Sequence, residues 1–211
     1  MPASGGWPSS AGRRREPDRG RYDGPRMREV TVSTTISAPR EDVFDFVSDL
    51  AARPAFTDHF MDDYRLARVQ PVGVGAAARF KLDLPLANEY AELAITKADR
   101  PRQIIEELRV GRRGRNRSVG VWDFTREGPN VTRVELTTYS EPATLIDRVK
   151  ELGAAGWVRR RTRKSLDRLR TIFEEPDRVQ VKRATIAGYE PDKAARFGAH
   201  AGMDPARQSR L

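Results

Sequence analysis

One carboxylate among aliphatic side chains is the residue of this sequence best suited to acid–base chemistry. In residues 104–110, IIEELRV, the alternating register that contains Ile104 and Leu108 is the more apolar, and Glu106 belongs to it. A strand buries its more apolar face, so we expect Glu106 to point inward, where a carboxylate needs a partner or a raised pKa. It is a catalytic candidate, as a general base or as the group that orients a ligand hydroxyl. The alternatives are the opposite register and a place at the rim of the sheet, and Thr138 and Tyr90 are further polar candidates.

The sequence holds few of the side chains that nucleophilic catalysis or metal binding requires. It has no cysteine and only two histidines, His59 and His200. A disulfide framework, a thiolate metal site and a cysteine nucleophile are thereby excluded, and a histidine-rich metal centre or a Ser-His triad has little to work with. We interpret His59 as an exposed histidine near the mouth of a binding site. We expect neither a metal nor a cofactor.

A run of cations is the sharpest charge feature. Five basic residues fall within six positions: Arg159, Arg160, Arg161, Arg163 and Lys164. Such a run can attract the phosphates of an anionic membrane or of nucleic acid, and the alternative is a solvated helix face. No aromatic stacking platform or known motif accompanies it, so we do not expect specific nucleic-acid binding. Trp157, just before the run, favours a peripheral contact with an anionic membrane, because tryptophan suits the membrane interface.

The net charge of +9 is not spread evenly along the chain. Residues 28–142 hold 17 basic and 18 acidic side chains and are nearly neutral, whereas residues 143–173 hold nine and three. The excess therefore belongs mainly to one predicted helix, and the central part of the chain lacks the general basic character of a nucleic-acid-binding domain.

The two ends of the chain differ from its middle. We expect residues 1–27 to form a disordered basic leader and residues 176–211 a mostly disordered tail, because Gly, Pro and charged residues dominate both. The leader lacks the apolar centre of a secretory signal, and no run approaches the about 18 apolar residues that span a bilayer. With the absence of cysteine, this predicts a cytoplasmic protein.

The elements that must position these residues follow from the apolar patterns. Residues 29–37 alternate as a half-buried strand does, and a short helix follows, which Ser37 can cap and Pro39 can begin. A break at Arg53-Pro54 ends this region. Residues 61–142 contain closely spaced strands separated by Gly and Pro turns, which favours an antiparallel meander. Residues 143–173 have apolar stripes at helical spacing and predict one long helix.

The segment VSTTISAPREDVFDFVSDL, residues 32–50, with Pro54-Ala-Phe56 just beyond it, closely resembles the entry of the START-like (SRPBCC) superfamily. The resemblance covers roughly residues 28–173 and is to the polyketide cyclase/dehydrase-like and coenzyme Q-binding-like members. It implies an α+β helix-grip fold, with a curved antiparallel sheet of about seven strands wrapped around a long C-terminal helix and two short helices after the first strand. It also implies a cavity for lipids, polyketides, hormones or quinones. It supplies no catalytic residues, because the catalytic members share no single set.

The predicted lining of this cavity is mainly apolar. Its members share the inward faces of the predicted strands and helices: Phe56, Phe60, Phe80, Leu82, Leu93, Ile95, Ile104, Glu106, Leu108, Trp122, Phe124, Leu136, Thr138, Val149 and Leu152. A deeply curved sheet leaves space that side chains fill or a ligand occupies. The alternative for each residue is that it simply fills the core.

Three functions are compatible with these patterns. We favour the binding or carriage of a small hydrophobic ligand, with a cyclase or dehydrase enzyme as the alternative from another class. Polar groups that converge around Glu106 would favour the enzyme. The third function is an accessory protein that contacts an anionic membrane or nucleic acid through residues 157–170, and salt-sensitive binding would favour it. The patterns do not indicate the oligomeric state.

Overall fold

A computed structural model describes residues 28–84, 88–111, 114, 116–141, 145–179 and 181–188 of the 211-residue chain. Its elements follow in chain order: β1 (Arg28–Ile36), α1 (Arg40–Ser48), α2 (Pro54–Thr57), β2 (Met61–Leu66), β3 (Ala77–Asp83), β4 (Asn88–Asp99), β5 (Gln103–Val110), β6 (Asn116–Gly128), β7 (Val131–Glu141), α3 (Leu145–Glu174) and η2 (Pro176–Arg178). Residues 1–27, the predicted leader, lie outside the described part.

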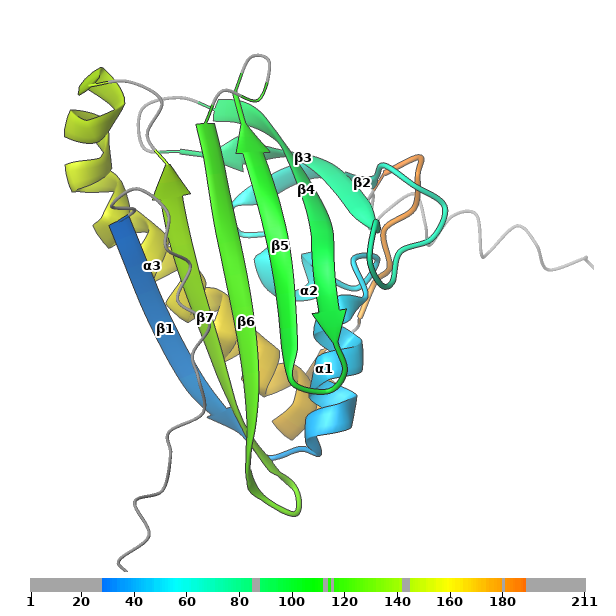
Figure 1. The fold of residues 1–211 in the computed structure, drawn as a ribbon. Coiled ribbons are helices and arrows are strands. Elements are labelled where there is room, and N and C mark those ends of the chain that lie inside the picture. Colours follow the sequence, from blue (N-terminus) through cyan, green and yellow to red (C-terminus); the bar gives the residue numbers. More distant parts are fainter. Residues whose placement is uncertain are drawn as a thin grey trace, which may run out of the picture.

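The seven strands form one antiparallel sheet in the order β1-β7-β6-β5-β4-β3-β2 (Figure 1). Strands β2 to β7 are a meander of sequential neighbours, and β1 pairs with the last of them. The predicted seven-stranded helix-grip fold is confirmed. β1 and β2 are the edge strands of the sheet.

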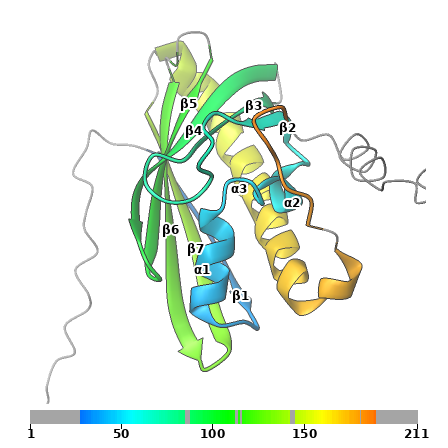
Figure 2. The same cartoon turned by 90° about the vertical axis from the view of Figure 1, so that its right-hand side faces the viewer.

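The three α-helices lie on the same face of the sheet, which curves around them (Figure 2). The closest backbone neighbours of α3 are β1 and α2. Leu166, Leu169 and Ile172 are buried on the side of α3 that faces the domain. Of the predicted apolar stripe Leu166, Leu169 and Phe173, the two leucines are therefore in the core, and Phe173 is partly buried against it. Within the described residues, no helix has the length and apolar character needed to cross a membrane.

The predicted helix cap at Ser37 is wrong. Pro39 stands at the N-cap of α1 and makes no side-chain cap, while Glu41 and Asp42 complement the dipole of the first turn. The backbone amide and the hydroxyl of Ser37 instead donate to one carboxylate oxygen of Glu174, at 3.1 and 2.9 Å. The carboxylate at the end of α3 thus fastens this helix to the corner between β1 and α1.

Aromatic side chains fill the end of the core beside this corner. Phe44 of α1 meets Phe124 of β6 edge to face, with ring centroids 5.3 Å apart. Phe46 meets Phe173 of α3 in the same manner at 5.4 Å. Such pairs add about 0.5–1.5 kcal/mol each to the burial of their area. This end of the domain is therefore closed by packed rings.

The domain continues past the boundary predicted at residue 175. Ala184 is buried, and its amide donates to the carbonyl of Ala51 at 2.7 Å. The amide of Leu66 in β2 donates to the carbonyl of Thr185 at 2.9 Å. Residues 181–188 therefore lie against the open edge of β2, because this edge offers unpaired backbone groups and a small apolar side chain fits beside it. Residues 189–211 of the predicted tail lie outside the described part.

Candidate functional site

The strand register places Glu106 on the inner face of the sheet. Glu106 pairs with Ile95 of β4 on one side and with Gly120 of β6 on the other. Gly120 pairs in turn with Thr138 of β7. The residue is 7% exposed, so a carboxylate lies in an interior that is otherwise mainly apolar. The predicted inward register is the one that the structure has.

The partner of this carboxylate is Arg53, at the start of α2. Its Nη2 lies 3.0 Å from one carboxylate oxygen, and its Nη1 lies 3.5 Å from the other. The Arg53 side chain is 2% exposed, and its Nη2 also donates to the carbonyl of Val47 at 3.1 Å. A buried charge of either sign is tolerated only when it is paired, so each residue depends on the other. The sequence pattern indicates only a break at Arg53-Pro54 and does not predict this role of Arg53.

Two aromatic rings complete the surroundings of Arg53. Its guanidinium carbon lies 5.2 Å from the ring centre of Trp122 and 5.6 Å from that of Phe56. The two rings meet edge to face at 6.4 Å. A weakly hydrated, planar guanidinium is well suited to this environment, because it can stack on rings while its N–H groups bind a carboxylate.

The carboxylate needs a glycine opposite it. A Cβ atom at Gly120 would lie 2.9 Å from Cγ of Glu106 and 3.1 Å from one of its oxygens. Because Gly120 has no side chain, there is space for the Glu106 side chain to extend toward Arg53.

Two buried N–H donors of this site have no partner. Nε of Arg53 and Nε1 of Trp122 are inaccessible to solvent and make no hydrogen bond in the described part of the chain. Buried donors are nearly always paired, and leaving one unpaired costs about 1–3 kcal/mol. Each of these N–H groups is therefore free to donate to an acceptor that does not belong to the described part of the chain.

Most of the predicted apolar lining is buried on the inner face. The buried members are Phe56, Phe80, Leu82, Leu93, Ile95, Ile104, Trp122, Phe124 and Leu136, and the partly buried ones are Phe60, Leu108 and Thr138. Phe124 belongs to the closed aromatic end. The side chains of Val149 and Leu152 lie outside the described part. Tyr90 is 68% exposed and is no inward candidate, because Ala91 and Leu93 hold the inner register of β4.

His59 is half-buried, so the interpretation of it as an exposed residue is wrong. Its Nε2 lies 3.3 Å from the carbonyl oxygen of Arg161, and its Nδ1 has no partner among the described residues. Burial, with smaller contributions from nearby cations such as Arg168 and Lys164, lowers the pKa of His59 to about 4. The ring is therefore neutral at physiological pH.

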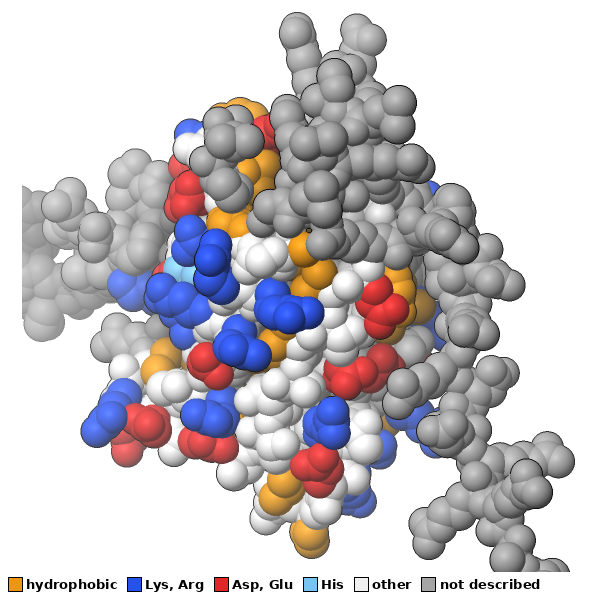
Figure 3. All heavy atoms as spheres, turned by 90° about the vertical axis from the view of Figure 1, so that its left-hand side faces the viewer, with side chains coloured by type: hydrophobic (Ala, Val, Ile, Leu, Met, Phe, Trp, Pro, Cys, Tyr) orange, Lys and Arg blue, Asp and Glu red, His pale blue; other side chains and the backbone are white. Residues whose placement is uncertain are grey.

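The structure divides the predicted basic run into two parts. Arg159, Arg160, Arg163 and Lys164 are exposed. Figure 3 shows one face of the molecule on which Lys and Arg side chains gather. Arg161 instead turns toward the domain, where it donates to the carbonyl of His59 at 3.0 Å and to the Asp83 carboxylate at 3.2 Å. Its guanidinium lies 5.6 Å from the ring centre of Trp157. Four cations of the run, rather than five, are turned outward.

The described residues contain no group of three or more His, Cys, Asp or Glu side chains placed to hold a metal ion. The polar part of the inner site is therefore the Arg53–Glu106 pair with Trp122 beside it. This group can bind a hydrogen-bond acceptor of a ligand, and the neighbouring apolar side chains can contact the hydrophobic part of the same ligand.

Residues 27–174 match the family described as polyketide cyclase/dehydrase and lipid transport. The chain belongs to this family. The match spans the sheet and all three α-helices, and the family description covers both catalysis and carriage. No curated protein sequence matches the chain.

Several solved structures have a similar fold. The KanY protein is 20% identical, with a TM-score of 0.59 over 70% of this chain and 98% of that one. The ZhuI aromatase/cyclase from Streptomyces sp. R1128 is 18% identical, with a TM-score of 0.57 over 72% and 96%. A START superfamily protein from Mycobacterium smegmatis is 17% identical, with a TM-score of 0.53 over 70% and 98%. At these identities the likeness establishes the fold alone.

Proposed function

We propose that this family member binds and carries a small hydrophobic ligand of the lipid, polyketide or quinone kind between the inner face of the sheet and α3. The observation that carries the proposal is the pair of buried, unpartnered donors, Nε of Arg53 and Nε1 of Trp122. A ligand oxygen that accepts from one or both would remove the cost of leaving them unpaired. The family description, which includes lipid transport, supports the same function.

The charges at the site specify the polar part of the ligand. Glu106 already balances the charge of Arg53, so the favoured group is a neutral acceptor such as a carbonyl oxygen and not a second carboxylate. The buried apolar side chains near Glu106, among them its cross-strand neighbour Ile95 and the preceding inward residue Ile104, favour a largely hydrocarbon or aromatic ligand. The proposed ligand is thus apolar with one buried oxygen acceptor.

A cyclase or dehydrase reaction is the second candidate. The ion pair supplies a carboxylate that accepts a proton and a cation that stabilises a developing enolate oxygen, and the family description names this chemistry. Against it, Arg53 contacts both oxygens of Glu106, so the base is occupied unless a substrate displaces its partner. Carriage requires no such displacement and is therefore preferred.

Native mass spectrometry of the purified full chain, followed by extraction of bound small molecules, tests the proposal. We expect an apolar molecule with an oxygen acceptor that is recovered chemically unchanged. Conversion of a bound polyketide-like compound, lost in Glu106→Gln, would favour the enzyme instead. An empty protein that also fails to bind an apolar fluorophore would refute both.

Substitutions on the two faces of the sheet provide the matched comparison. Leu136→Arg places a charge on the inner face and should abolish fluorophore binding. Ser33→Arg places the same charge on the exposed outer face of β1, one register position away from the partner of Leu136, and should leave binding unchanged. Equal binding by both folded variants would exclude the inner face as the site.

A further inference from the structure

Four cations form a continuous stripe on the outer face of α3. We use the name basic stripe for Arg159, Arg160, Arg163 and Lys164, all of which are exposed. At about 100° per residue, the stripe spans an arc of about 140°. The buried residues of the same length of helix occupy the opposite arc: Thr162, Ser165, Leu166 and Leu169. The stripe therefore faces away from the domain.

In the part of the chain that the structure describes, the stripe makes no ion pair, and Asp167, which follows Arg163 by four residues and Lys164 by three, lies beyond salt-bridge distance of both. The ion pairs that α3 makes there use other arginines: Arg161 with Asp83, Arg168 with Asp58, and Arg170 with Glu174. Within the stripe, like charges stand four residues apart at Arg159 and Arg163 and again at Arg160 and Lys164, an arrangement that weakens a helix. The middle of a long helix gains nothing from its dipole to offset this repulsion. An anionic partner would offset it.

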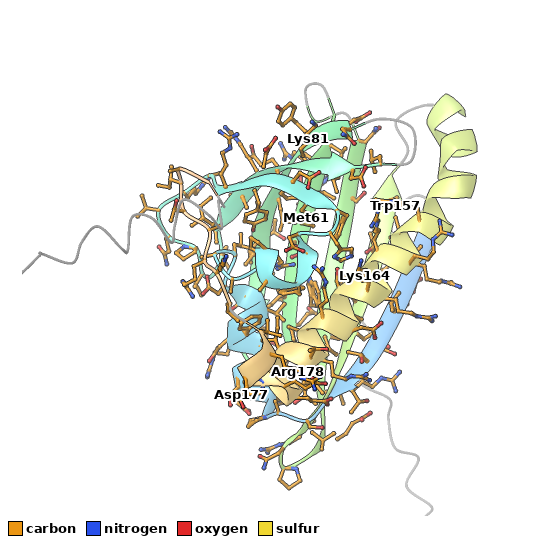
Figure 4. The ribbon with its side chains drawn as sticks, turned by 180° about the vertical axis from the view of Figure 1, so that it is seen from behind. Met61, Lys81, Trp157, Lys164, Asp177 and Arg178 are labelled. Carbon is orange, nitrogen blue, oxygen red and sulfur yellow. The ribbon has the colours of Figure 1, made fainter. Side chains whose placement is uncertain are left out.

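Apolar side chains border the stripe. Trp157 lies about 20° beyond Lys164 on the helical wheel, where the exposed face meets the buried one. Its ring is half-buried and meets Phe60 edge to face at 6.0 Å, and Met61 and Leu84 are also only partly covered. Figure 4 shows Trp157 and Lys164 on the length of α3 that lies beside Met61. Cations thus adjoin a partly exposed apolar border with a tryptophan.

We propose that the basic stripe and Trp157 dock the protein on an anionic bilayer surface. Anionic headgroups attract the four cations, and the indole is suited to the boundary between headgroups and acyl chains. This inference rests on the proposed function, because a carrier of an apolar ligand must exchange it with an apolar phase. Nucleic acid would use the cations but has no use for the apolar border of Phe60, Met61 and Trp157.

Vesicle co-sedimentation of the full chain tests the proposal. The vesicles are pure phosphatidylcholine or an equal mixture of phosphatidylcholine and phosphatidylglycerol, at low and at physiological ionic strength. We expect binding to the anionic vesicles only, weakened by salt. The variant Arg160→Gln/Arg163→Gln/Lys164→Gln should bind about a hundredfold more weakly, since each cation near such a surface contributes about 1 kcal/mol, which is about fivefold in affinity.

A control with the same net charge separates the stripe from the general basic character of the protein. Arg65, Lys97 and Arg102 are exposed on β2, β4 and the turn after β4. Replacing all three by Gln removes the same charge outside the stripe and should leave vesicle binding nearly unchanged. Tryptophan fluorescence should shift to shorter wavelength on binding, and Trp157→Phe should remove this shift.

Three results would overturn the proposal: no binding to anionic vesicles at low ionic strength, equal losses in the stripe variant and the control, or binding to duplex DNA without binding to vesicles. Fluorophore binding in solution measures ligand binding separately from vesicle binding, so failure of one proposal can be distinguished from failure of the other. The stripe variant should still bind the fluorophore as the wild type does. A wild type that binds vesicles but no apolar molecule would refute carriage while retaining the docking surface.

Discussion

Gly120 of β6 and Glu106 of β5 are cross-strand partners, and the hydrogen of the glycine faces the side chain of the carboxylate. The close approach leaves no room for a methyl group. Because Arg53 contacts both oxygens of the same carboxylate, a shift of Glu106 away from a larger residue would disturb the ion pair. The inner site therefore depends on a residue that contributes no functional group.

Gly120→Ala should lower the free energy of unfolding by about 1–3 kcal/mol, the usual cost of overpacking a core. Gly156→Ala is the matched control, because Gly156 is exposed on α3 and a Cβ there meets nothing within 4 Å. It should be neutral or stabilise by up to about 1 kcal/mol, since alanine favours helix over glycine. Urea denaturation of both variants measures the difference, and equal stabilities would contradict the proposed crowding.

Replacing one residue of the buried ion pair should lower the stability of the domain more than replacing both residues together. Glu106→Gln leaves Arg53 buried and uncompensated and should lower the free energy of unfolding by about 3–5 kcal/mol. Arg53→Met should lower the free energy of unfolding by a similar amount, because it leaves Glu106 buried without a partner. The double variant should be more stable than the sum of the two losses predicts. Additive losses in this cycle would mean that the two residues do not interact.

Stability should depend on pH through His59. Its pKa is about 4 in the folded protein and about 6.5 when unfolded, so the unfolded chain binds the proton more readily. The contribution of the neutral ring is complete above pH 6.5 and is lost as the pH falls toward 4. Because the side chain is partly exposed, we expect a loss of only about 1 kcal/mol.

The comparison with His59→Gln isolates this contribution from the titrating carboxylates. The stability of the wild type relative to the variant should fall between pH 7 and pH 5, as denaturant titrations at several pH values would measure. His200 is present in both proteins and cancels. A constant difference over this range would contradict the lowered pKa of His59.

Removal of the docked C-terminal segment should destabilise the domain. Truncation after residue 179 deletes the buried Ala184, its hydrogen bond to Ala51, and the ion pair of Arg183 with Asp49 at 2.6 Å. We expect a loss of about 1–2 kcal/mol, which lowers the Tm by about 2–8 °C. Truncation after residue 190 keeps these contacts and serves as the control. Equal melting temperatures would show that residues 181–188 contribute nothing to stability.

The sequence pattern predicted the elements well and their long-range partners poorly. The strand register that turns Glu106 inward follows from local alternation, and so does the long helix. The pairing of Glu106 with Arg53 could not be predicted in this way, because 53 positions separate the two residues and no periodicity connects them. The apolar neighbours of Arg53 in residues 50–56, LAARPAF, were the available indication that this cation is buried.

Other differences have the same origin. Ser37 has the residue type of a helix cap but donates its hydroxyl to Glu174, the last residue of α3. Arg161 belongs to the basic run by position, yet its place on the helix turns it toward His59 and Asp83. In each case, tertiary contacts select among local options that are close in energy.

The pairing of β1 with β7 has a consequence for how the protein is made. Val32 lies opposite Leu136, and Ser37 forms its hydrogen bond with Glu174, which is 137 positions later in the chain. Contacts between such distant residues require closure of a long loop, which slows folding. During synthesis, the first strand leaves the ribosome with no partner, and its apolar face stays uncovered until nearly all of the sheet and α3 have followed. We therefore expect the emerging chain to expose apolar surface that chaperones bind until its last helix is complete.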